Sequence, residues 1–219
     1  MTLELLLDSA DPIAWRQWLP SGLFSGITTN PTLLRRAGQP CALEPLQELA
    51  AEALALGARQ LHLQTWGADV EAATCRGLAL ARIDPDRVLV KVPVTQAGTE
   101  TARRLIAEGV AVTFTACYEV PQVLIAAALG ARYIAPYLGR ISDSGRDGLA
   151  TLSAMQRCLD GVGSSTRLLV ASLRQPSDLA ELSAAGLSTF TISPEIAAAL
   201  FACQATDAAA AQFELDAAG

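Results

Sequence analysis

The sequence alternates between short β-branched runs and longer stretches rich in alanine and leucine, and this alternation constrains the fold most strongly. The β-branched runs predict eight strands, at 3–8, 26–30, 60–65, 87–94, 110–117, 133–138, 167–172 and 188–193. The other stretches predict helices, at 11–19, 32–56, 69–82, 96–108, 120–130, 147–160, 177–185 and from 194 to the end. Eight such units in 219 residues are typical of a closed barrel of parallel strands. We therefore predict a single (β/α)8 TIM barrel domain over 1–219, with an extra C-terminal helix near 206–217.

Composition excludes several classes of function. The net charge of −6 argues against nucleic acid as a partner, because a phosphate backbone requires a basic face. No apolar run approaches the ~20 residues of a membrane span, and the first residues, MTLELLLDSA, lack the basic start of a signal peptide. Neither GxGxxG nor GxxxxGK[ST] occurs, which argues against dinucleotide and P-loop sites. We expect a soluble, cytoplasmic protein with no membrane partner.

Metal chemistry also finds little support in the residue inventory. The five cysteines are scattered without a CxxC pair, and they are best interpreted as reduced and mostly buried. The single histidine, His62, cannot build a three-histidine zinc site, and its place on the third predicted strand favours a hydrogen-bonded core residue. Cys117 is predicted on the inward face of the fifth strand, as packing rather than as a nucleophile. We predict no metal and no cofactor.

Lys91 is the one lysine in a chain with 15 arginines, and it lies inside the apolar run RVLVKVPV. Side chains alternate along a strand, so Val88, Val90 and Val92 are predicted to face the helices and Lys91 the barrel interior. Burial lowers the pKa of a lysine, and a neutral amine can form a Schiff base with a ketone. Arginine cannot replace it, because a guanidinium stays protonated. The alternative is a structural ion pair between Lys91 and Asp8.

Active sites of such barrels lie at the C-terminal ends of the strands, where this chain places a series of polar residues. The candidates there are Asp8, Thr28, Thr29, Asn30, Gln64, Lys91, Thr115, Tyr137, Arg140, Ser172 and Arg174. Tyr137 is a candidate general acid and base, with Gln64 and Thr115 to hold a water, although packing alone would also explain a tyrosine there. Arg140, Ser172 and Arg174 suit a phosphate monoester; surface salt bridges are the alternative.

Five segments together resemble the small transaldolase family, which includes fructose-6-phosphate aldolase. They are GITTNP (26–31), VKVPVT (90–95), FTACY (114–118), APYLGRISD (135–143) and VASLR (170–174). The resemblance runs at nearly constant spacing from LLLDSAD near the start to FELD near the end. It implies a (β/α)8 barrel, sugar phosphates as small-molecule substrates, class I aldol chemistry without a cofactor, and homo-oligomers, as pentameric rings that often pair into decamers.

The same resemblance implies a role for each matched residue. Lys91 matches the lysine that forms the Schiff base. Asp8 and Asn30 match residues that orient the dihydroxyacetone unit, with Thr28 and Thr29 beside them. The phosphate-binding positions are matched by Arg140, Ser172 and Arg174.

Two matched positions separate the activities within the family. Transaldolases typically carry glutamate where this chain has Gln64 and phenylalanine where it has Tyr137, whereas the aldolase subgroup has glutamine and tyrosine. The resemblance therefore implies an aldolase that cleaves fructose 6-phosphate between C3 and C4. The alternative is a transaldolase that passes the three-carbon unit to erythrose 4-phosphate, giving sedoheptulose 7-phosphate. Thr113, Phe114 and Cys117 depart from the small residues expected on the fifth strand, and this bears on the same choice.

Two rival hypotheses come from other classes. A buried lysine beside a phosphate site also describes a pyridoxal phosphate protein, which would be yellow. A non-enzymatic barrel that binds sugar phosphates would keep its ligand affinity after Lys91→Arg, whereas an aldolase would lose turnover.

Overall fold

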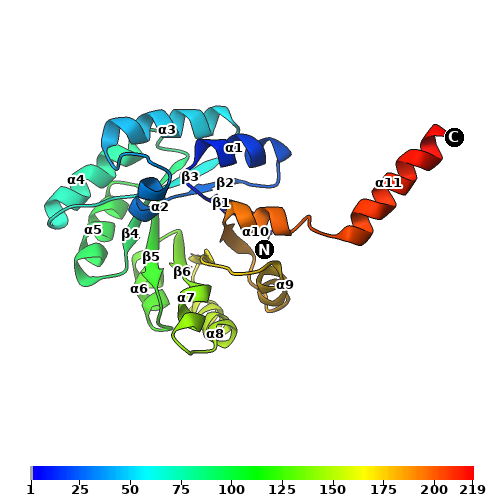
Figure 1. Ribbon diagram of the computed structural model, residues 1–219. Helices are drawn as coiled ribbons and strands as arrows, with labels where there is room; N and C mark the ends of the chain where they lie inside the picture. The colour runs from blue at the N-terminus through cyan, green and yellow to red at the C-terminus, as the bar shows by residue number, and fades with distance from the viewer. Residues whose placement is uncertain (1) are drawn as a thin grey trace.

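The computed structural model describes residues 2–219, and in it eight parallel strands form one curved sheet (Figure 1). The strands are β1 (Glu4–Asp8), β2 (Gly26–Thr28), β3 (Gln60–Gln64), β4 (Val88–Pro93), β5 (Val112–Cys117), β6 (Tyr133–Pro136), β7 (Arg167–Leu168) and β8 (Thr189–Ile192). Their spatial order is β7-β6-β5-β4-β3-β2-β1-β8. Val170 joins the two outer strands, since its N–H donates to Thr189 O at 2.9 Å and its carbonyl accepts from Thr191 N at 2.8 Å. The predicted (β/α)8 barrel is confirmed.

Helices lie on the outer side of the barrel, except the last one, which projects from it (Figure 1). They are α1 (Pro12–Trp18), α2 (Pro31–Arg36), α3 (Leu43–Ala55), α4 (Val70–Ala81), α5 (Gln96–Ala107), α6 (Gln122–Leu129), α7 (Leu138–Asp143), α8 (Gly148–Gly161), α9 (Pro176–Ala184), α10 (Pro194–Ala199) and α11 (Gln204–Ala218), with a 3₁₀ turn, η1, at Leu19–Ser21. None of the helices within residues 2–219 combines the length and the apolar character needed to cross a bilayer.

The apolar core has two layers, which follow from the alternation of side chains along each strand. The larger layer lies between the strands and the helices, and it contains Val88, Val90 and Val92 of β4. The smaller one fills the barrel interior with Leu6, Leu89, Tyr133, Ala135 and Leu169. Because Leu89 faces inward and the three valines outward, Lys91 also faces inward, as predicted.

One predicted helix is two. The stretch 32–56 contains α2 and α3, separated by residues 37–42. Gly38 stands in this break with a φ of 68°, a left-handed conformation that glycine adopts without strain. Pro40 follows and cannot supply the N–H that a continuous helix needs. The composition of this stretch is helical throughout and therefore did not predict the turn. The turn ends α2 close to the carboxyl ends of the strands.

The predicted strand ends at 138 and 172 are shorter in the structure. β6 ends at Pro136, and Leu138 already begins α7, a helix that the sequence analysis did not predict. β7 contains only Arg167 and Leu168, and beyond it Val170 and Ala171 make isolated bridges. Ser172 has a φ of 61°, which takes the chain out of the extended conformation. These early endings place short helices and turns, rather than strands, around the mouth of the barrel.

Cys117 faces the helix layer, so its predicted inward position is wrong. Ala116 has a φ of 57°, and the pairing of β5 with β6 shifts register between Phe114 and Cys117. This irregularity inserts one extra residue into the alternation, so that Thr115 points inward and Cys117 outward. Cys117 is fully buried among apolar neighbours, and burial raises the pKa of its thiol to about 12. Its predicted packing role therefore stands, on the other face of the strand. The expectation that the cysteines are mostly buried is wrong, because Cys41, Cys75 and Cys203 are exposed.

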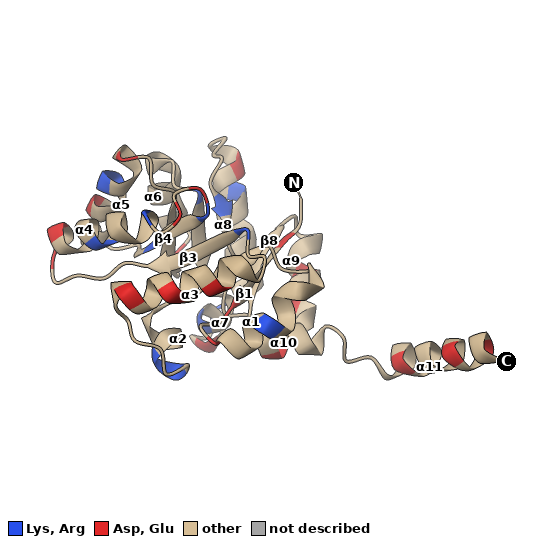
Figure 2. Ribbon diagram, turned by 90° about the horizontal axis from the view of Figure 1, so that it is seen from above, with Lys and Arg blue, Asp and Glu red and all other residues tan. Residues whose placement is uncertain are grey.

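The C-terminal helix α11 projects from the barrel (Figure 2). All of its residues are exposed, including Phe213 and Leu215. It spans Gln204–Ala218, slightly longer than the helix predicted near 206–217, and a separate short helix, α10, precedes it.

Candidate active site at the carboxyl end of the barrel

A cavity of about 480 Å³ opens at the carboxyl ends of the strands. Eight of the candidate residues from the sequence line it: Asp8, Thr28, Asn30, Lys91, Tyr137, Arg140, Ser172 and Arg174. They come from five different strands or the loops that follow them, and they meet because parallel strands end at the same rim.

Lys91 lies at the base of this cavity, and its side chain is 4% exposed. Its Nζ donates a hydrogen bond to the carbonyl oxygen of Thr29 at 2.8 Å. Burial lowers the pKa of the amine, and the nearby Asp8 carboxylate opposes the change by favouring the charged form. No ion pair within 4.0 Å joins Lys91 to a carboxylate in the described part of the chain. A direct ion pair with Asp8 is therefore not what holds the lysine in place.

Asp8 ends β1 and lines the same cavity. Its Oδ1 accepts a hydrogen bond from Thr28 Oγ1 at 2.7 Å, and Thr28 Oγ1 lies 2.6 Å from Thr191 Oγ1. Because Thr28 gives its proton to the carboxylate, Thr191 must be the donor in the second bond. Burial raises the pKa of the Asp8 carboxyl, and Lys91 and Thr28 oppose the shift. At a given pH, a larger fraction of the Asp8 carboxyl is therefore protonated than in an exposed aspartate.

Tyr137 immediately follows β6, and its ring enters the cavity. The phenol oxygen lies 2.6 Å from Thr115 Oγ1. Burial raises the pKa of Tyr137, so the phenol keeps its proton at neutral pH. The ring of Tyr118 packs edge-on against it, with ring centroids 5.6 Å apart.

The two arginines at the mouth differ in their partners. Arg174 forms an exposed ion pair with Asp143. Arg140 instead lies over the Tyr137 ring, 4.9 Å from its centroid, and donates to the Tyr118 hydroxyl at 3.2 Å. Within residues 2–219 no carboxylate lies within ion-pair distance of Arg140. The surface salt bridge considered for these residues therefore exists at Arg174 and not at Arg140.

Asn30 serves the fold and faces the cavity. Its Oδ1 accepts from Thr32 N at 2.9 Å and Leu33 N at 3.0 Å, which caps the start of α2. The side-chain oxygen is thereby occupied, and the amide NH2 remains to donate to a cavity ligand.

Three other candidates do not line the cavity. Thr29 faces the helix layer, where its buried hydroxyl makes no hydrogen bond within residues 2–219, and only its carbonyl reaches Lys91. Thr115 contacts the cavity residue Tyr137 through its hydroxyl. Gln64 pairs with Lys91 across β3 and β4 and so lies beside it on the inward face.

Other residues of the cavity were not singled out from the sequence. Among them are Arg36, Asp143, Thr191 and Glu195. Thr191 was recognisable in principle, since it occupies an inward position of the last strand. Arg36 belongs to α2, and its direction depends on where that helix ends.

His62 lies below the cavity, as a fully buried, hydrogen-bonded residue of the barrel interior, which confirms its prediction. Its Nε2 lies 3.1 Å from Gln60 Oε1 and its Nδ1 lies 2.9 Å from Thr113 Oγ1. Burial holds the pKa of the imidazole well below its usual value, and the positive charges of Lys91 and Arg132 act in the same direction. His62 is therefore neutral.

The sequence matches a known family over nearly its full length. The profile of the family described as Transaldolase/Fructose-6-phosphate aldolase matches residues 5–218. A probable transaldolase of Phenylobacterium zucineum is 32% identical over 214 residues, covering 98% of this chain and 96% of the relative. A probable transaldolase of Rhodospirillum centenum is 34% identical over 215 residues, covering 98% and 90%.

Solved structures with low sequence identity share the fold. Thiamine phosphate pyrophosphorylase from Pyrococcus furiosus superposes with a TM-score of 0.61 at 14% identity, covering 87% of this chain and 85% of that one. A structure described as "Native KDPGal structure" gives a TM-score of 0.60 at 15% identity, covering 88% and 82%. These likenesses concern the barrel alone. On the match over residues 5–218, the chain belongs to the transaldolase/fructose-6-phosphate aldolase family.

Proposed function

We propose that the protein is a class I aldolase that cleaves fructose 6-phosphate between C3 and C4 through a Schiff base on Lys91. The products are dihydroxyacetone and glyceraldehyde 3-phosphate, and the reverse reaction is an aldol addition. The observation that carries this proposal is the burial of the one lysine at the base of the cavity, which lowers the pKa of its amine. A neutral amine is the form that attacks a ketone.

Schiff-base formation starts with attack of the Lys91 nitrogen on C2 of the ketose. The resulting carbinolamine loses its hydroxyl as water, which requires proton transfers beside the new C–N bond. Asp8 suits this role, because burial raises the pKa of its carboxyl and Thr28 holds its orientation. The product iminium withdraws electrons from the C3–C4 bond.

Cleavage removes the proton of the C4 hydroxyl, breaks the C3–C4 bond and leaves an enamine on Lys91. Glyceraldehyde 3-phosphate then departs, and C3 of the enamine needs one proton before hydrolysis can release dihydroxyacetone. Deprotonation of the C4 hydroxyl releases one proton, and protonation of C3 takes one up, so no net proton is needed. A water beside the Tyr137 phenol, together with that phenol, would carry the proton from one position to the other. The contact with Thr115 and the raised pKa of Tyr137 support this role.

The phosphate of the substrate fits the side of the cavity formed by Arg140, Ser172 and Arg174. Arg140 offers a guanidinium that pairs with aromatic groups rather than with a carboxylate. Arginine binds phosphate through paired, charge-assisted hydrogen bonds. The amide of Asn30 would hold the hydroxyl groups of the three-carbon unit.

A transaldolase is the second candidate, and the names of the relatives favour it. In that reaction the enamine attacks the aldehyde of erythrose 4-phosphate instead of taking a proton. Gln64 and Tyr137 favour the aldolase, because the resemblance associates glutamine and tyrosine with that subgroup.

The deciding experiment measures glyceraldehyde 3-phosphate release from fructose 6-phosphate, with and without erythrose 4-phosphate. Release without an acceptor is expected for the aldolase. Release that requires the acceptor would identify a transaldolase. Borohydride reduction in the presence of dihydroxyacetone tests the step that both share, because it should link one three-carbon unit to Lys91, detectable by peptide mass spectrometry. Absence of this adduct from an active enzyme would refute the Schiff base.

We also propose that α11 takes part in a homo-oligomer. Its apolar side chains Phe213 and Leu215 are exposed, and such side chains gain nothing unless another surface covers them. Light scattering should show a multimer for the full chain and a smaller species for a chain that ends before Gln204.

A further inference from the structure

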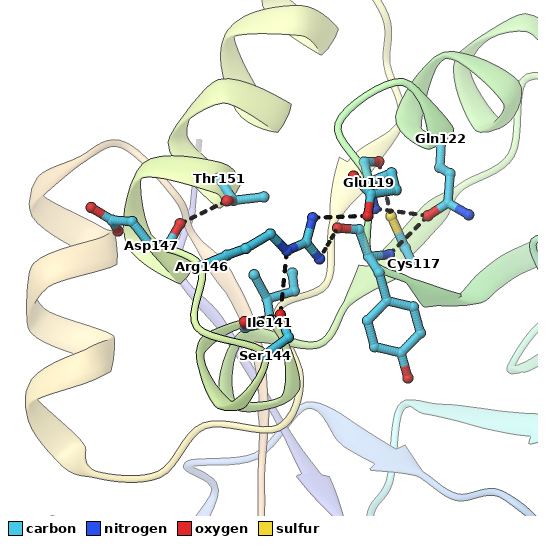
Figure 3. Close-up of polar contacts among 9 residues, drawn as sticks. Cys117, Glu119, Gln122, Ile141, Ser144, Arg146, Asp147 and Thr151 are labelled. Atoms are coloured by element: carbon cyan, nitrogen blue, oxygen red, sulfur yellow. Dashed lines mark hydrogen bonds and ion pairs between the residues drawn. The ribbon is translucent and has the colours of Figure 1, made fainter.

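The loop that joins β5 to α6 is tied to the turn between α7 and α8 by Arg146 (Figure 3). Arg146 Nη1 pairs with Glu119 Oε1 at 2.8 Å, and Nη2 donates to the carbonyl oxygen of Tyr118 at 2.9 Å. Its Nε donates to Ser144 Oγ at 3.4 Å. The next residue, Asp147, caps the start of α8 and so anchors the arginine backbone. One guanidinium therefore joins two loops that follow different strands.

A second contact fixes the same loop from the other side. The Oε1 of Gln122 accepts from Tyr118 N at 2.8 Å and from Glu119 N at 2.9 Å (Figure 3). Both the N–H and the carbonyl of Tyr118 are thus bonded to side chains. Rotation of the Tyr118 backbone would break at least one of these bonds, so the direction in which its side chain leaves the backbone is set.

The side chain of Tyr118 leads from this anchored loop to the cavity. Its ring packs edge-on against Tyr137 at an interplanar angle of 79°, and its hydroxyl accepts from Arg140 Nη1 at 3.2 Å. Arg140 and Tyr137 line the cavity, whereas Tyr118 does not. Tyr118 therefore touches the site only through these two residues.

The partner of Arg140 at this mouth is a hydroxyl oxygen and not a carboxylate. A carboxylate in the same place, such as Asp143 beside Arg174, would orient the guanidinium but also compete with a bound anion. A neutral hydroxyl oxygen restricts the rotamer of Arg140 and leaves its positive charge for the ligand. Preorganisation of this kind improves binding by reducing the side-chain entropy lost on association.

We propose that Tyr118, held by Arg146, is a positioning residue that orients Arg140 for the phosphate group of the substrate. This inference rests on the proposed function in assigning the phosphate to Arg140. It adds that the β5–α6 loop controls preference for phosphorylated over non-phosphorylated aldehydes.

The test compares the wild type with Tyr118→Phe in the aldol addition of dihydroxyacetone to two aldehydes, glyceraldehyde 3-phosphate and glyceraldehyde. Phenylalanine keeps the ring packing against Tyr137 and removes only the acceptor for Arg140. We expect KM for the phosphorylated aldehyde to rise about five- to tenfold, with kcat nearly unchanged. The kinetic constants for glyceraldehyde should not change. Equal changes with both aldehydes, or none with either, would overturn the proposal.

Arg146→Gln tests the anchor. It should produce the same selective rise in KM, at about two- to fivefold, because Tyr118 keeps its Gln122 contacts. Arg157→Gln is the matched control: Arg157 is an exposed arginine of α8, and its loss should leave both aldehydes unaffected. In the double variant with Tyr118→Phe, the effect of Arg146→Gln should largely disappear, because both act through one contact. Full additivity would contradict this link.

Direct binding separates failure of this inference from failure of the proposed function. Inorganic phosphate, titrated calorimetrically into the wild type and the variants, requires no catalysis. We expect weaker binding by Tyr118→Phe and the largest loss with Arg140→Ala. Equal binding by the wild type and Tyr118→Phe would refute the role of Tyr118, even if the enzyme is an aldolase. Selective loss of phosphate binding would support it even if no aldol reaction is found.

Discussion

The two ends of the barrel both hold charged groups away from solvent, but these groups differ in how many hydrogen bonds they make. At the amino end, the Glu4 carboxylate accepts from four donors. Arg167 binds it at 2.8 Å, Tyr133 at 3.1 Å and Ser25 at 3.3 Å, and Gln60 supplies the fourth bond. At the carboxyl end, Lys91 has one hydrogen bond, to a backbone carbonyl. The amino end is saturated, whereas the carboxyl end keeps groups available for a ligand.

The difference extends to His62, which lies between the two ends. Gln60 Nε2 donates to Glu4, so Gln60 Oε1 is the acceptor that faces His62, and His62 Nε2 must carry the proton. Its Nδ1 then accepts from the Thr113 hydroxyl. The hydrogen bonds that start from Glu4 at the amino end of the barrel thus fix one neutral tautomer of His62, which lies below Lys91. Buried polar groups with all of their hydrogen bonds made stabilise one structure. Buried polar groups with few hydrogen bonds are candidates for catalysis or ligand binding.

The largest effect is expected for Lys91→Met, which removes the amine and keeps an unbranched side chain. Turnover of fructose 6-phosphate should fall at least about a thousandfold, because no other amine lies in the cavity. Steady-state release of glyceraldehyde 3-phosphate measures it, with circular dichroism as the check on folding. Substantial activity in this variant, or in Lys91→Arg, would exclude Schiff-base catalysis.

The second-largest effect is expected for Tyr137→Phe, which removes a phenol hydroxyl at the carboxyl end of the barrel. The rate of dihydroxyacetone formation should fall about a hundredfold, a common size for loss of a general acid. Thr115→Val removes only the partner of the phenol and should have a smaller effect. If Tyr137→Phe instead lost aldolase activity but kept transfer to erythrose 4-phosphate, protonation of the enamine would be the step that the phenol serves.

A change at the amino end of the barrel should instead lower stability and leave kcat nearly unchanged. Glu4→Gln leaves Arg167 without its counter-ion and should lower the free energy of unfolding by about 2 kcal/mol, because the pair is only partly buried. Urea titration measures this loss. The kcat of the folded enzyme should stay close to that of the wild type. A large fall in kcat would show that the two ends are not independent.

The smallest effect is the pH dependence of stability that Lys91 creates. Burial lowers its folded-state pKa below the value in the unfolded chain, so between the two values only the unfolded state binds the proton. Stability contributed at this site therefore rises with pH across that window, by at most about 1.4 kcal/mol per pH unit. Below the window both states are protonated and the burial penalty is felt in full. Urea titrations of the wild type and Lys91→Met should converge or cross as pH rises; parallel curves would argue against a lowered pKa.

Local sequence patterns predicted the direction of several side chains at the carboxyl end of the barrel. The alternation in β4 placed Val90 outward and Lys91 inward, and the structure agrees. The same rule was wrong for Cys117, because the left-handed conformation of Ala116 shifts the alternation by one residue. Thr28 and Thr29 are adjacent in the sequence, yet one contacts Asp8 and the other faces the helices.

The sequence by itself determined the succession of eight strands and helices, the inward direction of Lys91 and the burial of His62, because each depends on local periodicity and composition. Only the tertiary structure decided which polar groups meet. Thr191 reaches Thr28 across 163 residues of chain, and Arg140 finds a phenol where Arg174 finds a carboxylate. Such pairs depend on barrel closure and on where each loop turns, and neither is a property of a short stretch of residues.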